Sequence, residues 1–328
     1  MVDFIDRARG CLIGLAVGDA LGSPTEGKSP QQIRERWGRI VDFLSDDQAG
    51  SDDTEYALFN AKLFLKHGWS ITSDIIADAW LDEIYSESHH YKSAGFSEIL
   101  ALKNLKAGLR PPQPGQHLHS WSDGLAMRVA PFGIVAAGAP ELAAQLAEID
   151  GCVSHAGEGI LCGRAVAAAI SAAMIGAELD KILSSALSMV PEDSWTSRSI
   201  REAVAIGEGA SDVWGALQPL HDRIACSYYF WSDVGPEAVG LAFGVLAAAR
   251  GKFEDAVLGG VNVGRDTDTI AAIASAITGA SAGLGAIPEK WVKRVQVVPG
   301  VCIKSVKGIN ILEMAIELGK LAIKKASK

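Results

Sequence analysis

One stretch of the chain reads GGVNVGRDTDTIAAIA at residues 259–274. Asp266 and Asp268 are each followed by a threonine, and they stand between a glycine-rich segment and an apolar one. This order predicts that the acidic run begins a buried helix, because a helix start has free backbone N–H groups that favour carboxylates and hydroxyls. The pattern fits two interpretations: a doubly capped helix N-terminus, or a site at which a cation lies between the two carboxylates.

A second cluster with the same layout occurs far earlier in the chain. Ser51, Asp52, Asp53 and Thr54 combine hydroxyls and carboxylates directly before a helical pattern at 55–65. Taken alone, this cluster is typical of a capping box with Ser51 as the cap. Two such clusters, each leading into a buried helix, favour convergence on shared cations. Hard oxygen donors of this kind suit Mg²⁺, Mn²⁺ or Ca²⁺ better than Zn²⁺.

The composition excludes several classes of protein. The 328 residues are 48% hydrophobic, which is ample for a sizeable core, and the net charge of -9 argues against a general nucleic-acid binder. Five scattered cysteines without paired spacing suit reduced thiols and a cytoplasmic location. The charged N-terminus lacks the apolar core of a signal peptide. The alanine-rich runs at 165–177 and 238–249 are too short or too interrupted to span a membrane.

Apolar residues recur at helical spacing through most of the chain. The first helix is expected at 3–22, where Gly10, Gly14, Gly18 and Gly22 form one stripe along which another helix can approach closely. Further helices are expected at 31–37, 55–65, 72–85, 96–108, 139–148, 158–177, 180–190, 197–207, 212–224, 236–249, 253–258, 289–295 and 308–325, besides the one that begins at the second acidic cluster.

The segment at 226–231 is the most strand-like in the chain, but it is isolated. No alternation of strands and helices, no phosphate loop and no repeat of fixed period is present. With about a dozen helices and almost no strand, the sequence predicts an all-α fold in a single domain over residues 1–328.

The residue pattern alone does not decide the roles of three further features. Glu26 follows a helix stop after Gly22, and an acid there is usually a solvated loop residue. The polar and aromatic loop at 117–124 is a candidate substrate loop, with a surface excursion as the alternative. His155 lies at a helix entry between small residues, although a lone histidine is more often structural than catalytic.

Several motifs considered together point to a known family. They are Gly-Asp-Ala-Leu-Gly at 18–22 with Glu26 after it, Ser51-Asp52-Asp53-Thr54, Met127-Arg128, His155, and Gly264-Arg265-Asp266-Thr267-Asp268-Thr269. In these motifs the chain resembles the ADP-ribosylglycohydrolases, which include the hydrolase that reactivates ADP-ribosylated dinitrogen reductase. The resemblance covers nearly the whole chain. It implies an all-α orthogonal helical bundle with two Mg²⁺ or Mn²⁺ ions in a central cleft.

The resemblance also implies roles for single residues. It assigns the metal ligands to Ser51, Asp52, Asp53, Asp266, Asp268 and Thr269. It places the family's mobile and catalytically important glutamate on Glu26, and one of the carboxylates of the metal set, taken as Asp53, would help the attacking water. The loop that holds ADP-ribose falls on Ser122, Asp123 and Gly124, with His155 also near the substrate.

Two positions depart from the family's usual pattern. The first cluster commonly begins with threonine and here begins with Ser51, whose hydroxyl can still bind a metal ion. The substrate loop usually has asparagine where this chain has Asp123. A carboxylate there removes a hydrogen-bond donor and adds negative charge beside a pyrophosphate, so this position bears directly on the choice of substrate.

The implied activity is hydrolysis of the ribosyl C1 bond of an ADP-ribosylated protein or of a small ADP-ribose derivative, through an oxocarbenium-like transition state. The residue pattern is compatible with linkage to arginine, serine, an acetyl ester or a base. The alternatives are a hydrolase of small N-ribosides or nucleosides, which Asp123 favours, a non-catalytic protein like the lens crystallin that is similar to this family, and a metal-dependent phosphoesterase.

Overall fold

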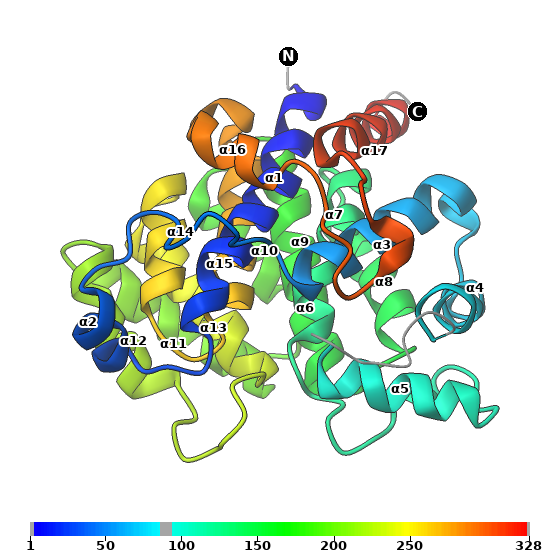
Figure 1. Cartoon of the computed structure of the whole chain (residues 1–328), viewed down its shortest axis with the longest axis horizontal. Coiled ribbons are helices and arrows are strands. Elements are labelled where there is room, and N and C mark those ends of the chain that lie inside the picture. Colours follow the sequence, from blue (N-terminus) through cyan, green and yellow to red (C-terminus); the bar gives the residue numbers. More distant parts are fainter. Residues whose placement is uncertain (1–2, 86–93, 327–328) are drawn as a thin grey trace.

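The structure, a computed structural model, describes residues 3–85 and 94–326. This part of the chain is 70% helical and contains no β-strand, so the predicted all-α fold is confirmed. The α-helices, coloured along the chain in Figure 1, are α1 (Phe4–Gly22), α2 (Pro30–Trp37), α3 (Asp52–His67), α4 (Ser73–Ala79), α5 (Phe96–Lys106), α6 (Gly124–Arg128), α7 (Ala130–Val135), α8 (Pro140–Gly151), α9 (Glu158–Met174), α10 (Leu179–Leu187), α11 (Trp195–Gly209), α12 (Val213–Ile224), α13 (Gly235–Ala248), α14 (Phe253–Asn262), α15 (Thr267–Ala282), α16 (Glu289–Val295) and α17 (Ile311–Ala326).

Helices α1 and α15 form the central pair of the fold, although they lie near opposite ends of the sequence (Figure 1). The glycine stripe of α1 faces α15, as the sequence predicts. A Cβ atom at Gly18 would lie 2.4 Å from the carbonyl carbon of Ala271, and one at Gly22 would lie 2.5 Å from the backbone N of Asp268. Only a residue without a side chain permits this approach, so α1 fixes the position of the helix start that carries the second acidic cluster.

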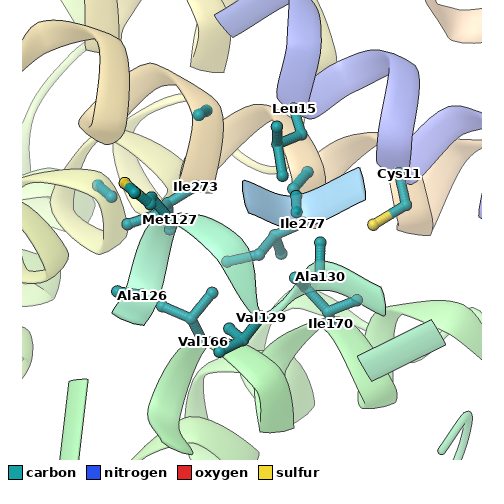
Figure 2. Packing of buried hydrophobic residues seen from close by; sticks show 14 of the residues in the cluster. Cys11, Leu15, Ala126, Met127, Val129, Ala130, Val166, Ile170, Ile273 and Ile277 are labelled. Atoms are coloured by element: carbon teal, nitrogen blue, oxygen red, sulfur yellow. The ribbon is translucent and has the colours of Figure 1, made fainter. Parts of the chain in front are cut away.

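The core surrounds this pair. Figure 2 shows aliphatic side chains of α1 and α15 packed over those of α6, α7 and α9. The labelled members are Cys11 and Leu15 of α1, Ile273 and Ile277 of α15, Ala126 and Met127 of α6, Ala130 of α7 with Val129 before it, and Val166 and Ile170 of α9. All of them are buried. Because α3, α6 and α15 each contribute to this core and each begins at a polar segment, their first turns are held on a rigid base.

Most predicted helices are present within a few residues of their expected bounds, and the differences are local. The segment at 226–231 forms turns and bends, so its strand-like reading is wrong. Its aromatic side chains pack against other rings instead of pairing with a strand. The short helices α6 and α7 were not predicted, and the expected helix at 72–85 continues beyond α4 as a π-helix, Trp80–Tyr85.

The predicted domain of residues 1–328 includes two ends, 1–2 and 327–328, that lie outside the described residues. The one-domain reading of the chain stays a prediction. None of the helices in the described part combines the length and the apolarity that crossing a lipid bilayer requires.

Candidate active site

The first acidic cluster stands at the start of α3. Ser51 occupies the N-cap position, and Asp52 and Asp53 form the first turn. The side chain of Ser51 does not cap its own helix. Instead, the carboxylate of Asp19, from the last turns of α1, accepts the backbone N–H of Ser51 at 2.8 Å and that of Thr54 at 3.1 Å. A buried acid from another helix therefore replaces the expected capping box, which leaves the carboxylates of the first turn available for other contacts.

The second acidic cluster stands at the start of α15. Asp266 occupies the N-cap position without a side-chain capping hydrogen bond, and Thr267, Asp268 and Thr269 form the first turn. The hydroxyl of Thr269 donates to the Oδ1 of Asp53 at 3.2 Å, across 216 residues of sequence. The two clusters therefore meet, as predicted, and neither N-cap side chain serves the capping role that was the alternative interpretation.

A cavity of about 330 Å³ lies where the two helix starts meet. Its acidic wall contains all six residues that the resemblance assigns to metal, and its other side contains the predicted substrate loop. The lining residues are Ser23, Glu26, Ser51, Asp52, Asp53, Ala94, Gly95, Phe96, Glu98, Ser122, Asp123, Gly124, Met127, Trp231, Ser232, Asp233, Asp266, Asp268 and Thr269. A cavity with this many carboxylates attracts cations and positively charged groups.

The carboxyl groups of the cavity are crowded and buried. Burial, with neighbouring carboxylates adding to it, raises the pKa of Asp52, Asp53 and Asp266 well above the usual range. Burial likewise raises the pKa of Asp268. The buried Oδ2 of Asp53 and Oδ1 of Asp268 have no hydrogen-bond partner. Groups of this kind are stable as carboxylates only when a positive charge approaches them.

The donor set suits divalent cations, since it consists of carboxylate and hydroxyl oxygens of residues that line one cavity, and two of the buried carboxylate oxygens have no hydrogen-bond partner among the described residues. No group of three or more His, Cys, Asp or Glu side chains is yet arranged as a metal site in the part of the chain that the structure describes. The oxygens would therefore have to turn toward an ion, starting with Asp53, whose Oδ1 now accepts the hydroxyl of Thr269.

Glu26 lies at the exposed edge of the cavity. The 3₁₀ turn Ser23–Thr25 brings it there from the end of α1, and the backbone N–H of Gly27 donates to the carbonyl of Arg265 at 2.8 Å. The negative charge of Asp268, together with burial, raises the pKa of Glu26 to about 7. Glu26 is thus a solvent-exposed loop residue, as its sequence context predicts, and it also lies beside the acidic clusters.

The predicted substrate loop forms the opposite wall. Ser122 and Asp123 are buried, and Gly124 begins α6. A Cβ at Gly124 would lie 2.3 Å from the Oε1 of Glu98, so the glycine lets the loop pass close to that acid. Burial and the charge of Asp233 raise the pKa of Asp123 well above its usual range, and its Oδ2 has no partner. A protonated Asp123 donates a hydrogen bond, as an asparagine at this position would.

His155 does not line the cavity. It is buried behind Ser122, whose hydroxyl lies 3.0 Å from its Nε2, while its Nδ1 lies 2.8 Å from the hydroxyl of Ser154. Burial, aided by the charge of Arg128, lowers the pKa of His155 well below its usual value, so the ring is neutral. His155 therefore supports the substrate loop from behind, which fits the structural alternative better than direct contact with substrate.

Several site residues were missed by sequence reasoning. Asp19 was quoted only as part of a motif, and Glu98 and Asp233 were not singled out, yet the last two line the cavity. Arg128 is fully buried and pairs with Glu98 at 2.8 Å and with Asp150 at 2.7 Å. For Asp19 and Glu98 the available signal was an acid within an apolar helical pattern, since a charge is rarely buried without a partner.

The sequence profile of the ADP-ribosylglycohydrolases matches residues 1–324. The chain belongs to this family. It is 34% identical over 298 residues to an uncharacterised protein of Archaeoglobus fulgidus, covering 88% of this chain and 91% of that protein. It is 26% identical over 298 residues to the ADP-ribosylarginine hydrolase Tri1 of Pseudomonas putida, covering 89% of this chain and 74% of Tri1.

A solved structure described as an ADP-ribosylglycohydrolase-related protein complex has the same fold. It superposes with a TM-score of 0.71 at 23% identity, over 98% of this chain and 100% of the solved chain. The family assignment supports glycohydrolase chemistry on ADP-ribosylated substrates. It also agrees with the all-helical architecture.

Proposed function

We propose that this protein is a metal-dependent glycohydrolase that cleaves the bond at C1 of ribose in ADP-ribose conjugates. The observation that carries the proposal is the meeting of two acidic helix starts in one cavity, marked by the contact between Thr269 and Asp53. Membership of the ADP-ribosylglycohydrolase family supports ADP-ribose conjugates as the substrates that bind in that cavity. The five free cysteines agree with reaction in the reducing cytoplasm.

Two Mg²⁺ or Mn²⁺ ions would be held by the oxygens of Ser51, Asp52, Asp53, Asp266, Asp268 and Thr269. The unpartnered oxygens of Asp53 and Asp268 support this assignment, as does the burial that makes isolated carboxylates costly. Bound divalent ions would supply positive charge that makes a nearby water more acidic and that orients the ribose hydroxyls.

Proton transfer, charge stabilisation and substrate binding are assigned to individual residues of the cavity. Asp53 accepts a proton from the water that attacks C1, and the negative wall of the cavity stabilises the positive charge of the oxocarbenium-like transition state. Glu26, at the rim, would close the cavity or add a carboxylate oxygen to those that hold the ions. Ser122 and Gly124 bind the ADP-ribose moiety, and His155 holds Ser122 in place through the 3.0 Å contact of its Nε2.

We infer that the bond cleaved joins ribose to a positively charged guanidinium. Three acids besides the six proposed metal ligands also line the cavity: Glu98, Asp123 and Asp233. Within the described part of the chain, Asp233 has no ion pair with a basic side chain, and Glu98 and Asp123 each keep one carboxyl oxygen without a hydrogen-bond partner, so these groups can accept hydrogen bonds from a cationic group. A guanidinium is always charged and binds carboxylates through paired hydrogen bonds. The relative from Pseudomonas putida is named as a hydrolase of ADP-ribosylarginine, which is consistent with this choice.

The first test is calorimetric titration of Mn²⁺-loaded protein with ADP-ribose, adenosine and ribose. Tight binding of ADP-ribose that disappears with a chelator supports the proposal. Metal-dependent binding of adenosine without binding of ADP-ribose would instead favour a nucleoside hydrolase, the alternative that the carboxylate of Asp123 suggests. Release of free arginine from ADP-ribosylarginine, compared with release from serine and acetyl-ester conjugates, then identifies the linkage.

A variant test separates catalysis from simple binding. Asp268→Ala is expected to abolish both Mn²⁺ binding and turnover, because Asp268 lines the cavity and its buried Oδ1 has no hydrogen-bond partner in the part of the chain that the structure describes. The matched control is Glu254→Ala, an exposed acid in the first turn of α14 outside the cavity. Full activity of the Asp268→Ala variant would refute the proposed role.

A further inference from the structure

Arg265 has a backbone conformation that is unusual for its type. Its φ is +69°, in the left-handed region where glycine is the unstrained residue. Among the described residues, the only other non-glycine with positive φ is Arg250, at +54°. Arg265 directly precedes Asp266, so the unusual turn delivers the second acidic cluster to the cavity. A large charged side chain at such a position indicates that the side chain itself has a task.

The guanidinium of Arg265 is buried and holds the aromatic loop at 226–233. Its Nε donates to the Oε1 of Glu237 at 2.5 Å, and its Nη2 donates to the carbonyl of Trp231 at 2.8 Å. The other oxygen of Glu237 accepts the backbone N–H of Cys226 at 2.5 Å. The loop is thereby held at its start through Glu237 and near its end by Arg265 directly.

This loop forms one wall of the cavity. Trp231 and Asp233 line it, and the ring of Trp231 packs edge-on against that of Phe96 with centroids 4.5 Å apart. Elsewhere in the loop, Tyr228 and Phe230 are almost fully exposed, whereas Tyr229 packs against Trp121 with ring centroids 5.5 Å apart. The carbonyl of Asp233 also accepts the N–H of Asp123 at 3.3 Å, which ties the end of the loop to the substrate loop. The bond from Arg265 to the Trp231 carbonyl is the one that ties it to the turn bearing Asp266.

The main chain of Arg265 completes the arrangement. Its N–H donates to the carbonyl of Lys28, and its carbonyl accepts the N–H of Gly27, both at 2.8 Å. These two bonds hold the turn that carries Glu26. Because they involve backbone atoms, they persist when the side chain is replaced, whereas the bonds to Glu237 and Trp231 do not. A substitution of Arg265 can therefore release the aromatic loop at 226–233 while the turn that carries Glu26 stays held.

We propose that Arg265 is a positioning residue: its guanidinium fixes the aromatic loop at 226–233 to the turn that bears Asp266, and this link sets the affinity of the cavity for its substrate. A purely structural ion pair would explain the contact with Glu237 alone. It would not explain the second bond, to the carbonyl of Trp231, which joins the loop to the acidic turn directly. The affinity part of this inference rests on the proposed function.

The test combines hydrogen exchange with ligand binding in matched variants. Arg265→Gly relieves the backbone and removes the link, and the added Glu237→Gln avoids leaving a buried, unpaired carboxylate. Arg265→Lys keeps the charge without the planar fork that reaches both partners. Arg250→Gly is the control, since it makes the same change of residue at the other positive-φ arginine, which bonds the carbonyls of Glu208 and Ala210 and lines no part of the active cavity.

In the Arg265→Gly/Glu237→Gln protein, amides of 226–233 should exchange at least about tenfold faster than in the wild type, the effect of one lost charge-assisted hydrogen bond. The Kd for ADP-ribose and the KM for ADP-ribosylarginine should rise about tenfold, with kcat within about threefold, because Asp266 and Glu26 keep their backbone supports. Arg265→Lys should fall between this variant and the wild type, and Arg250→Gly should match the wild type in amide exchange, Kd, KM and kcat.

Unchanged exchange at 226–233 in the double variant overturns the inference, whether or not ADP-ribose binds. Faster exchange with an unchanged Kd and KM also overturns it, because the link would then have no effect on affinity. A wild-type protein that binds no ADP-ribose refutes the proposed function, while the exchange comparison still decides whether Arg265 holds the loop.

Discussion

Asp19 on α1 binds Ser51 through both of its carboxylate oxygens, which accept the backbone N–H at 2.9 and 2.8 Å, and Oδ1 also accepts the serine hydroxyl at 2.8 Å. The hydroxyl of Thr54 donates to the same carboxylate at 2.5 Å. Asp19 thus holds the start of α3 from outside that helix. The side chains of Asp52 and Asp53 therefore have no capping role. The position of the helix start that carries them depends on Asp19, an acid in another helix.

Asp19→Asn should therefore weaken both the fold and the cavity. The amide nitrogen would face donors of Ser51 or Thr54, at a cost of about 1–3 kcal/mol of unfolding free energy, and Mn²⁺ affinity should fall with it. Denaturant unfolding and metal titration measure the two effects. Asp212→Asn, at the exposed N-cap of α12, is the control and should change little, because asparagine caps as well as aspartate. Equal effects of the two substitutions would contradict this account of Asp19.

Gly22→Ala tests the close packing of α1 against the second cluster. The new methyl group would lie 2.4 Å from the carbonyl oxygen of Thr267 and 2.5 Å from the Cα of Asp268, so α15 must shift at its first turn. We expect a loss of about 1–3 kcal/mol of unfolding free energy and weaker Mn²⁺ binding. Gly209→Ala, where a Cβ meets nothing within 4 Å, is the matched control. Wild-type metal affinity in Gly22→Ala would show that Asp268 does not depend on this contact.

The stability of the metal-free protein should decrease as pH rises. Burial raises the pKa of Asp19 from 3.8 to about 6, and Asp268 with burial raises that of Glu26 from 4.5 to about 7. Because these pKa values are higher in the folded protein, their contribution to stability is fully present below about pH 4 and is lost as pH rises through 6 to 7.

Thermal unfolding in chelator between pH 5 and 8 checks this sign, and Mn²⁺ should raise Tm most at pH 8, where ionised carboxylates bind it. Glu26→Gln should flatten the decline between pH 6 and 8, since it removes a carboxyl group whose pKa of about 7 lies in that range. A Tm that rises with pH in chelator would contradict the expected linkage.

Asp123→Asn examines the unusual residue of the substrate loop. An amide supplies a donor at every pH, whereas the carboxyl of Asp123 supplies one only while protonated. Since its pKa is raised, the two proteins should bind ADP-ribose alike at low pH, and Asp123→Asn should bind about tenfold more tightly at high pH. Titration calorimetry at pH 5.5 and 8.5 measures both. Tighter binding by the wild type at pH 8.5 would mean that the carboxylate favours the substrate.

The sequence predicted the parts of this structure that depend on local pattern. Helical spacing predicted α1 and its glycine face, and the layout of hydroxyls and carboxylates predicted that α3 and α15 begin at the acidic clusters. Their meeting, seen between Asp53 and Thr269, also followed from the similarity of the two clusters. The assignment of metal to these residues stays a prediction.

What the sequence did not predict depends on contacts between distant segments. Hydrophobic spacing indicates which face of α1 is buried, but it does not indicate that Asp19 on that helix meets the start of α3. The same holds for Glu98, which pairs with Arg128 in another helix, and for the bond from Arg265 to Trp231. His155 showed room for a ligand in its sequence context, yet Ser122 occupies the space in front of it.

The pairing of α1 with α15 joins two helices that a ribosome makes some 245 residues apart. The hydroxyl of Thr267 donates to the carbonyl of Gly22 across 245 residues. At about 5–20 residues per second, α1 waits roughly 12–50 s for its partner to be synthesised. During that time its glycine face and the acid of Asp19 are uncovered. Chains released before α15 is complete lack both the core pair and half of the cavity, so they should be substrates for chaperones and proteases and have no residual activity.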